Sequence, residues 1–87
     1  MKYGALGDAY SELNDFDRAL GYYEDAVDQG DNGIVTAYYL KKLGMLHERN
    51  GNMAEALKAY QKIREEFPTT PDARNIEKYI TRAEAAG

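Results

Sequence analysis

The sequence is poor in the side chains on which most catalytic and metal sites depend. It contains no cysteine and one histidine, His47, and Ser11 is its only serine. Without cysteine, neither a disulfide framework nor a thiolate zinc site can form. A Ser-His-Asp or Cys-His system would have to use His47, and no acid is plainly placed to orient its ring. We therefore expect no catalytic residues, no metal ligands and no enzyme activity.

Long hydrophobic runs are also missing. The longest run covers residues 37–40, far short of the roughly 18 residues that suggest a membrane span, and no basic, apolar leader precedes it. A chain of 87 residues hides only about 60 to 65% of its unfolded surface on folding. We expect one small domain over residues 1–87, without a deep enzyme cleft and without membrane contact.

Positive charge is scarce in the first part of the chain. The net charge is −4, from 11 Lys and Arg against 15 Asp and Glu. Residues 1–33 carry 2 of these cations and 8 of these acids, a net charge of −6, whereas residues 34–87 carry 9 and 7, a net charge of +2. The acidic residues 1–33 would repel phosphate backbones, and the sequence has no run of Lys and Arg interleaved with aromatic residues. We therefore expect no nucleic-acid binding.

Loops that bind calcium or phosphate are absent from the pattern as well. Residues 28–33 have the acidic and amide side chains of a calcium loop, but its third position is Gly30 and its twelfth is Tyr39, where a bidentate Glu is needed. The glycines are scattered along the chain and form no phosphate-binding loop. We expect no cofactor.

What the sequence does contain is an internal repeat with a period of 37 residues. The identical matches at this separation are Leu6-Gly7 with Leu43-Gly44, Ala19-Leu20 with Ala56-Leu57, and Tyr23 with Tyr60. Looser matches that keep size or apolar character are Phe16 with Met53, Tyr3 with Leu40, and Ala26 with Ile63. A set of this size at one separation predicts two units of the same structure.

The apolar residues within each unit have helical spacing. From Phe16 they recur at i, i+3, i+4, i+7, i+10 and i+11, and from Met53 the same pattern repeats as far as i+10. The preceding halves, from Tyr3 to Leu13 and from Leu40 to His47, share this period, and residues 14–15 and 50–52 favour turns and caps. We predict an all-α fold: a helical hairpin over about 3–30, a second over about 34–67, and a capping helix over about 71–85 with Thr70 as its N-cap.

Gly7 and Gly44 lie inside the first helix of each predicted hairpin. Glycine in a helix costs about 1 kcal/mol relative to alanine, so a close approach between helices must favour it. We expect these glycines to let the first helix contact the second near Ala19 and Ala56.

These residues resemble the tetratricopeptide repeat. The motif residues are Leu6, Gly7, Tyr10, Ala19, Leu20, Tyr23 and Ala26, then Leu43, Gly44, Ala56, Leu57, Tyr60 and Pro68. Four features depart from the family pattern: His47 replaces an aromatic, Ile63 a small residue and Asp31 a proline, and the repeats are three residues further apart than the usual 34. We expect His47 to be a partly buried packing residue and the extra residues to lengthen the helix that begins near Ile34.

The resemblance implies an α-α superhelix and a non-catalytic protein-interaction module. In this family the first helix of each pair lines a concave groove that holds peptides or partner helices. At the matching positions Gly4, Ala5, Asp8, Ser11 and Glu12 would face the groove from the first repeat. The candidate groove residues further along are Tyr38, Lys41, Lys42, Met45, Arg49, Arg74 and Lys78. Their charge suggests an acidic peptide as the partner, while ordinary solvated helix charges are the alternative interpretation.

The ending, from Phe67 to Ile80, also resembles the C-terminal end of longer bacterial repeat proteins, some of which carry a membrane anchor upstream. Stacked repeats usually need at least three units or caps, and nothing in this sequence caps the first helix. We expect this helix to expose apolar surface that another repeat would cover. The alternative function is therefore a structural or self-association segment that packs on upstream repeats or forms a homodimer.

Overall fold

The computed structural model describes residues 2–30 and 32–86, and only the backbone of Lys2. The described elements are α1 (Lys2–Glu12), α2 (Phe16–Gln29), α3 (Gly33–Arg49), α4 (Met53–Glu66), the 3₁₀ helix η1 (Pro71–Asn75) and α5 (Ile76–Ala86). No strand occurs in these ranges. The prediction of two helical hairpins and a capping helix is confirmed. Asp31, expected in the break between the repeats, and both ends of the predicted domain, residues 1 and 87, lie outside the described residues.

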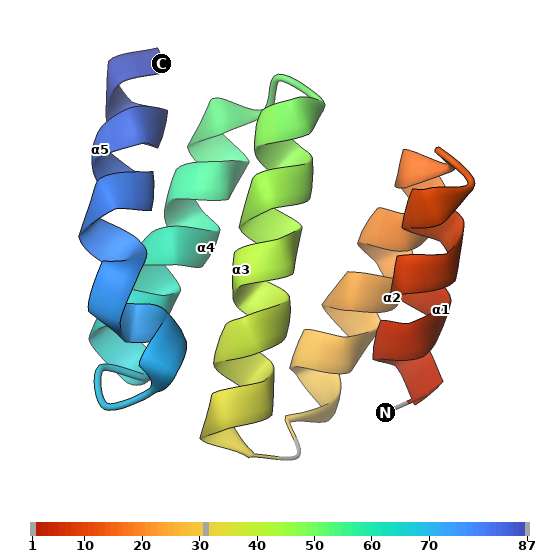
Figure 1. Cartoon of the computed structure of the whole chain (residues 1–87), viewed down its shortest axis with the longest axis horizontal. Coiled ribbons are helices and arrows are strands. Elements are labelled where there is room, and N and C mark those ends of the chain that lie inside the picture. The colour runs from red at the N-terminus through yellow and green to blue at the C-terminus, as the bar shows by residue number, and fades with distance from the viewer. Residues whose placement is uncertain (1, 31, 87) are drawn as a thin grey trace.

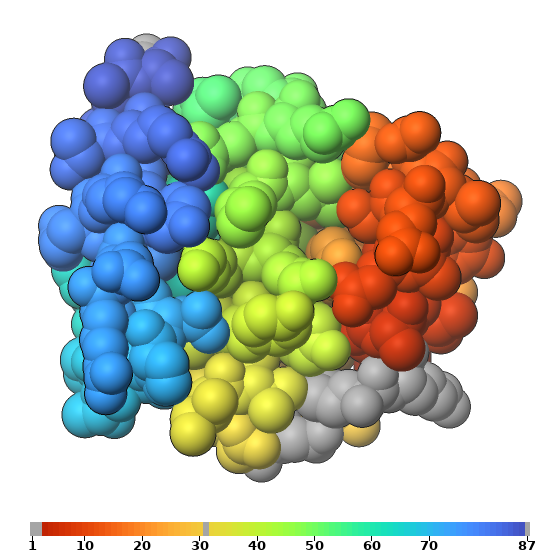
Figure 2. Space-filling model, in the orientation of Figure 1, coloured from red at the N-terminus to blue at the C-terminus, as the bar shows by residue number. Residues whose placement is uncertain are grey.

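The helices form two layers of antiparallel neighbours (Figure 1). α1 pairs with α2 and α3 pairs with α4, while α2 also packs on α3, and α4 on α5. As a result α1, α3 and α5 lie side by side on one face, with α2 and α4 behind them. Figure 2 shows this face with α3 in its middle, and we call it the groove face. None of the helices in the described ranges is long and apolar enough to cross a membrane.

Polar side chains begin two of the helices. Asp15 accepts a hydrogen bond from the backbone of Arg18 at 3.3 Å before α2, and Asn32 accepts one from Val35 at 2.9 Å before α3. Two predicted caps differ: Asn52 makes no side-chain cap hydrogen bond before α4, and Thr70 instead donates its hydroxyl to the carbonyl of Phe67 at 2.7 Å. The segment after Thr70 therefore begins as the 3₁₀ helix η1, and α-helical geometry starts only at Ile76.

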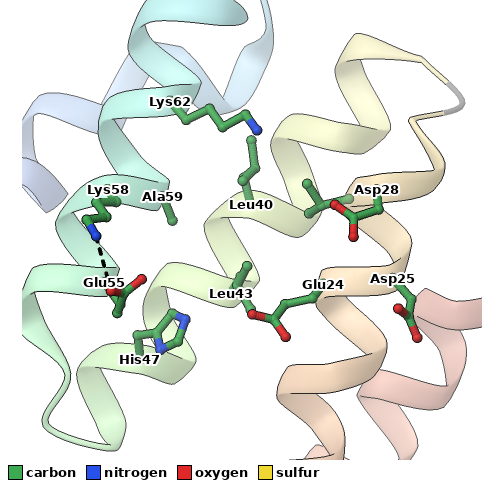
Figure 3. Close-up of a pocket in the computed structure, with 11 residues that line it drawn as sticks. Glu24, Asp25, Asp28, Leu40, Leu43, His47, Glu55, Lys58, Ala59 and Lys62 are labelled. Carbon is green, nitrogen blue, oxygen red and sulfur yellow. Dashed lines mark hydrogen bonds and ion pairs between the residues drawn. The ribbon is translucent and has the colours of Figure 1, made fainter.

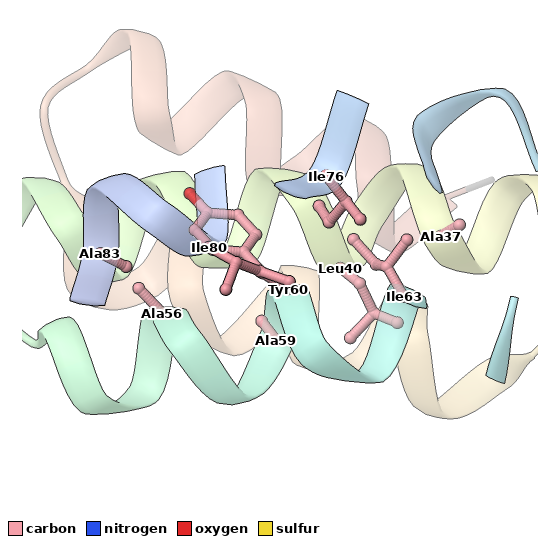
Figure 4. Packing of buried hydrophobic residues seen from close by; sticks show 9 residues of the cluster. All are labelled: Ala37, Leu40, Ala56, Ala59, Tyr60, Ile63, Ile76, Ile80 and Ala83. Carbon is pink, nitrogen blue, oxygen red and sulfur yellow. The ribbon is translucent and has the colours of Figure 1, made fainter. Parts of the chain in front are cut away.

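Most of the buried apolar volume lies in the second repeat. Its cluster joins side chains of α3, α4 and α5, as Figure 4 shows. The buried members are Ala37, Leu40, Ala56, Ala59, Tyr60, Ile63, Ile76, Ile80 and Ala83. A smaller buried cluster, Ala19, Tyr23, Leu43 and Leu46, joins α2 to α3. The capping helix thus completes the core of the second repeat, whereas α1 adds no fully buried side chain to either cluster.

Both helix-interior glycines allow a close approach, as predicted, but to a different residue. A β-carbon on Gly7 would lie 2.5 Å from the ring of Tyr23, and one on Gly44 would lie 2.5 Å from the ring of Tyr60. The nearest neighbours are therefore these tyrosines, one turn beyond the alanines that we expected. The tyrosine rings occupy the space that a side chain at these positions would need, so the glycines let the two helices of each hairpin approach closely.

Two expectations about residues of the first hairpin are wrong. Leu13, which we placed on the buried stripe, lies just after the helix ends at Glu12 and is 73% exposed. Gly4, which we expected to face the groove, is buried, and a β-carbon there would lie 2.0 Å from Tyr39. The side chain of Tyr39, from α3, occupies the space beside Gly4.

Candidate functional site

The seven candidate groove residues come from three elements of the groove face. Tyr38, Lys41, Lys42, Met45 and Arg49 belong to α3, Arg74 to η1 and Lys78 to α5. Because α3 lies between α1 and α5, its cations can contact acids on either neighbour (Figure 2).

Lys42 is already paired with an acid of the first repeat. Its ammonium lies 2.7 Å from a carboxylate oxygen of Asp8, which also accepts a hydrogen bond from the Tyr23 hydroxyl at 2.6 Å. Burial opposes ionisation of Asp8, but the hydrogen bonds from Lys42 and Tyr23 outweigh it and lower the pKa of Asp8. Burial and the bond to Asp8 raise the pKa of Tyr23, so its hydroxyl remains a donor. Asp8 therefore neutralises the cation that was expected to face a ligand.

Lys41 has an internal partner as well. Its ammonium lies 3.5 Å from Asp72 of η1 and 5.0 Å from the centre of the Tyr79 ring. This pair is partly shielded from solvent, since the two side chains are 24% and 19% exposed. Two of the five predicted groove cations are thus compensated by carboxylates of the chain itself.

The other three cations have no carboxylate partner within residues 2–30 and 32–86. The guanidinium of Arg49 lies 4.5 Å from the centre of the Phe16 ring, and the ammonium of Lys78 lies 5.3 Å from that of Tyr79. Arg74 is exposed on η1. Their positive charge remains available, although Arg49 lies toward α1 and α2 and the other two lie on the capping segment.

A hollow on the groove face adjoins Arg49. It has a volume of about 310 Å³, and its lining residues are Ser11, Tyr23, Lys42, Met45, Leu46 and Arg49. We call it the α1/α3 hollow. Met45 is 46% exposed and lies between the cations Lys42 and Arg49 along α3. The hollow combines an apolar floor with positive charge, and three of the seven predicted residues line it.

The contacts of a second carboxylate, Glu48, were not predicted from the sequence. Glu48 accepts hydrogen bonds from Tyr60 and from Arg82, whose two nitrogens lie 2.6 and 2.9 Å from its oxygens. Burial opposes ionisation, but these donors lower the pKa of Glu48. The same arrangement occurs in both repeats. Tyr23 donates to Asp8, which also binds Lys42 of α3. Tyr60, 37 residues later, donates to Glu48, which also binds Arg82 of α5. The repeated tyrosine could have indicated this network. The two acids are not at equivalent positions, however, because Glu48 lies about one helical turn beyond the position that matches Asp8.

The opposite face carries a cleft between α2 and α4, with α3 as its floor (Figure 3). Its volume is about 480 Å³, and its charged walls are Glu24, Asp25 and Asp28 on α2 and Glu55, Lys58 and Lys62 on α4. His47 lines it and is partly buried, as predicted, with its Nδ1 atom buried and without a hydrogen-bond partner among the described residues. None of the lining residues carries a hydroxyl or thiol nucleophile.

The described part of the chain also brings together no set of three or more His, Cys, Asp or Glu side chains with a spacing that could hold a metal ion.

Comparison with known proteins agrees with this arrangement. The family model described as tetratricopeptide repeat matches residues 5–71, from α1 into η1. The protein described as "Uncharacterized protein ycf37" of Guillardia theta is 34% identical over 61 residues, which cover 70% of this chain and 33% of that relative. The chain thus matches about a third of the length of this curated relative. No solved structure is significantly similar to it.

Proposed function

Because this chain belongs to the tetratricopeptide repeat family, we propose that it is a non-catalytic interaction module whose groove face holds an acidic peptide segment of a partner protein. The family generally provides scaffolds for protein partners, and the identity of this ligand is our proposal. The observation that carries it is the set of groove cations, three of which have no carboxylate partner in the described ranges.

The chemistry of the surface supports this choice. Cations on a groove steer an acidic segment and orient it, while apolar contacts such as Met45 and Tyr38 supply surface to bury. Tyr38 is 43% exposed and its ring lies 5.2 Å from the ammonium of Lys42. An aromatic ring next to a cation can pack on a peptide while the cation binds its carboxylates.

An array of acidic peptides, each printed beside its Gln and Asn counterpart, tests this function. Wild-type protein should retain acidic peptides preferentially, and the double variant Arg49→Glu with Lys78→Glu, which reverses two of the cations without a carboxylate partner in the described ranges, should lose at least about tenfold in affinity. The matched control is Lys58→Glu with Lys62→Glu on α4, which changes the charge equally on the opposite face. Equal loss in both double variants, or no loss in either, would contradict the groove assignment.

We also propose a second function, a structural segment that packs on an upstream repeat. One observation favours it: Leu43 and Leu46 are buried against α2, whereas their equivalents 37 residues earlier, Leu6 and Ala9, are exposed. The second helix of a preceding hairpin would cover Leu6 and Ala9 just as α2 covers Leu43 and Leu46.

A designed chain with residues 1–37 duplicated upstream tests this second function. If the new hairpin covers α1, the free energy of unfolding should rise by at least about 2 kcal/mol, and a Leu6→Lys substitution at the new junction should remove the gain. Met45→Lys is the matched control, because Met45 is similarly exposed but lies on the groove face. Light scattering on the 87-residue chain distinguishes a homodimer from a segment that packs on an upstream repeat. A homodimer would give a molar mass that rises with protein concentration.

A further inference from the structure

The chain contains two Asn-Gly dipeptides, residues 32–33 at the start of α3 and residues 50–51 just after its end. We propose that Asn50 is a site of spontaneous deamidation, whereas Asn32 is protected by the fold. The folded chain thereby gains a carboxylate in the turn between α3 and α4. This modification is separate from ligand binding on the groove face and does not depend on the proposed function.

The reaction uses only groups of the chain and solvent water. The backbone nitrogen of the glycine attacks the Cγ atom of the asparagine, and the side-chain amide leaves as ammonia together with the proton of that nitrogen. The product is a cyclic imide. Water then adds to one of the two imide carbonyls and opens the ring, which gives either aspartate or isoaspartate. Glycine favours the attack because it has no side chain to crowd the nitrogen.

The start of α3 holds Asn32 in place. Its side-chain oxygen accepts a hydrogen bond from the backbone nitrogen of Val35 at 2.9 Å, and its carbonyl accepts one from Thr36 at 2.9 Å. Gly33 is partly buried, and a β-carbon there would lie 3.3 Å from the Phe67 ring. Ring closure at Asn32 therefore requires that the side chain leave its cap and that the first turn of α3 open.

Asn50 is much less constrained. It is exposed, and its side chain makes no hydrogen bond within residues 2–30 and 32–86. Gly51 is also exposed, and nothing lies within 4 Å of the place that a β-carbon would occupy there. One hydrogen bond must open before the Gly51 nitrogen can attack, its bond to the carbonyl of Glu48 at 3.0 Å. This bond lies at the end of a helix, where fraying opens it at a low cost in free energy.

The product disturbs the turn between α3 and α4. Asn50 is the C-cap of α3, and it lines a hollow of about 420 Å³ together with Asp15 and Asp17. A carboxylate at residue 50 is repelled by these acids and by the negative end of the helix dipole. Isoaspartate also lengthens the main chain of the turn, which the hydrogen bond from Asn52 to the carbonyl of His47 at 2.8 Å closes. The modified chain is therefore less stable than the fresh one.

The experiment follows acid formation in the whole 87-residue chain, incubated in mildly alkaline buffer either folded or unfolded in urea. Trypsin places Asn32 in peptide 19–41 and Asn50 in peptide 50–58, and fragment masses distinguish residue 50 from Asn52. A chain that is digested without incubation sets the background. In the folded chain, acid should form at Asn50 at least about tenfold faster than at Asn32, whereas in urea the two rates should agree within about threefold.

Two variants sharpen the result. Asn50→Gln should abolish acid formation in peptide 50–58, because a glutamine side chain is one methylene longer and closes the ring poorly. Asn52→Gln is the matched control in the same turn, and it should leave the rate at Asn50 unchanged. Equal rates at the two Asn-Gly dipeptides of the folded chain, or a faster rate at Asn32, would overturn the proposal.

The stability of the product is measured on the aged fraction, which ion exchange separates from the fresh chain by its added negative charge. Its unfolding temperature should be lower by about 2 to 4 °C. An unchanged or higher unfolding temperature would overturn the inferred effect on the turn.

Discussion

Leu6 and Leu43 occupy the same place in the two repeats, yet Leu6 is 37% exposed and Leu43 only 8%. Both precede a glycine on which a tyrosine of the next helix packs. What differs is the neighbouring hairpin, since α2 covers Leu43 and nothing described covers Leu6. In a stacked repeat, the burial of a residue is therefore decided by the adjacent unit as much as by its own sequence.

The two cores differ in the same direction. The second repeat is enclosed by α2 on one side and α5 on the other, whereas among the described residues the first repeat has a packed neighbour only at α3. At equivalent positions of the second helices, Ile63 fills the core of the second repeat while Ala26 stands in the first. We therefore expect the second repeat with its capping helix to be the more stable part of the molecule.

The substitution Ile63→Ala should have the largest effect, because it gives the second repeat the small residue of the first. Ile63 is fully buried, and its removal should lower the free energy of unfolding by about 4 kcal/mol through lost transfer energy and a residual cavity. Chemical denaturation measures this change. Ile63→Val is the control, which should cost only about 1 kcal/mol.

The matched pair Leu43→Ala and Leu6→Ala sharpens the comparison directly. Leu43→Ala should destabilise the chain by about 3 kcal/mol, because α2 covers its side chain. Leu6→Ala should cost less, about 1 kcal/mol, because more than a third of its surface is already exposed to solvent. Similar losses for both variants in urea denaturation would mean that the first helix is covered in solution.

Periodicity predicted the parts of this molecule that depend on local sequence. The 37-residue offset identified both hairpins, and the glycine positions indicated the close helix contacts, although Tyr23 and Tyr60 were not recognised as the contacting residues. The ion pairs on the groove face were not predicted. Lys42 and Asp8 are 34 residues apart and Lys41 and Asp72 are 31 apart, so their pairing depends on how the hairpins are placed relative to each other. The three extra residues per repeat left that placement open at the level of sequence.

Acid titration compares the two tyrosine–carboxylate networks. Asp8 and Glu48 have folded-state pKa values below their ordinary values of 3.8 and 4.5, so their stabilisation is present above these values and is lost as the pH falls through the lower folded pKa. Between pH 7 and pH 3, Glu48→Gln should reduce the acid-induced loss of stability by about 1 kcal/mol and Asp8→Asn by about half as much. The difference follows from exposure, since the Glu48 side chain is 13% exposed and that of Asp8 is 42% exposed.

The order of these two effects is itself a test, and denaturation at each pH measures it. A larger effect for Asp8→Asn would mean that the first repeat holds its network more tightly than the second. Arg18→Gln is a suitable control, because its pair with Asp15 at 3.5 Å is exposed and should contribute almost nothing at either pH.

Native-state hydrogen exchange of the Tyr23 and Tyr60 amides tests the central comparison most directly, because these residues occupy equivalent positions in α2 and α4. If the uncovered first helix makes the first repeat the weaker unit, the Tyr23 amide should exchange at least about tenfold faster than that of Tyr60 under conditions where exchange reports opening free energy. Equal protection of the two amides, or stronger protection of Tyr23, would contradict the account.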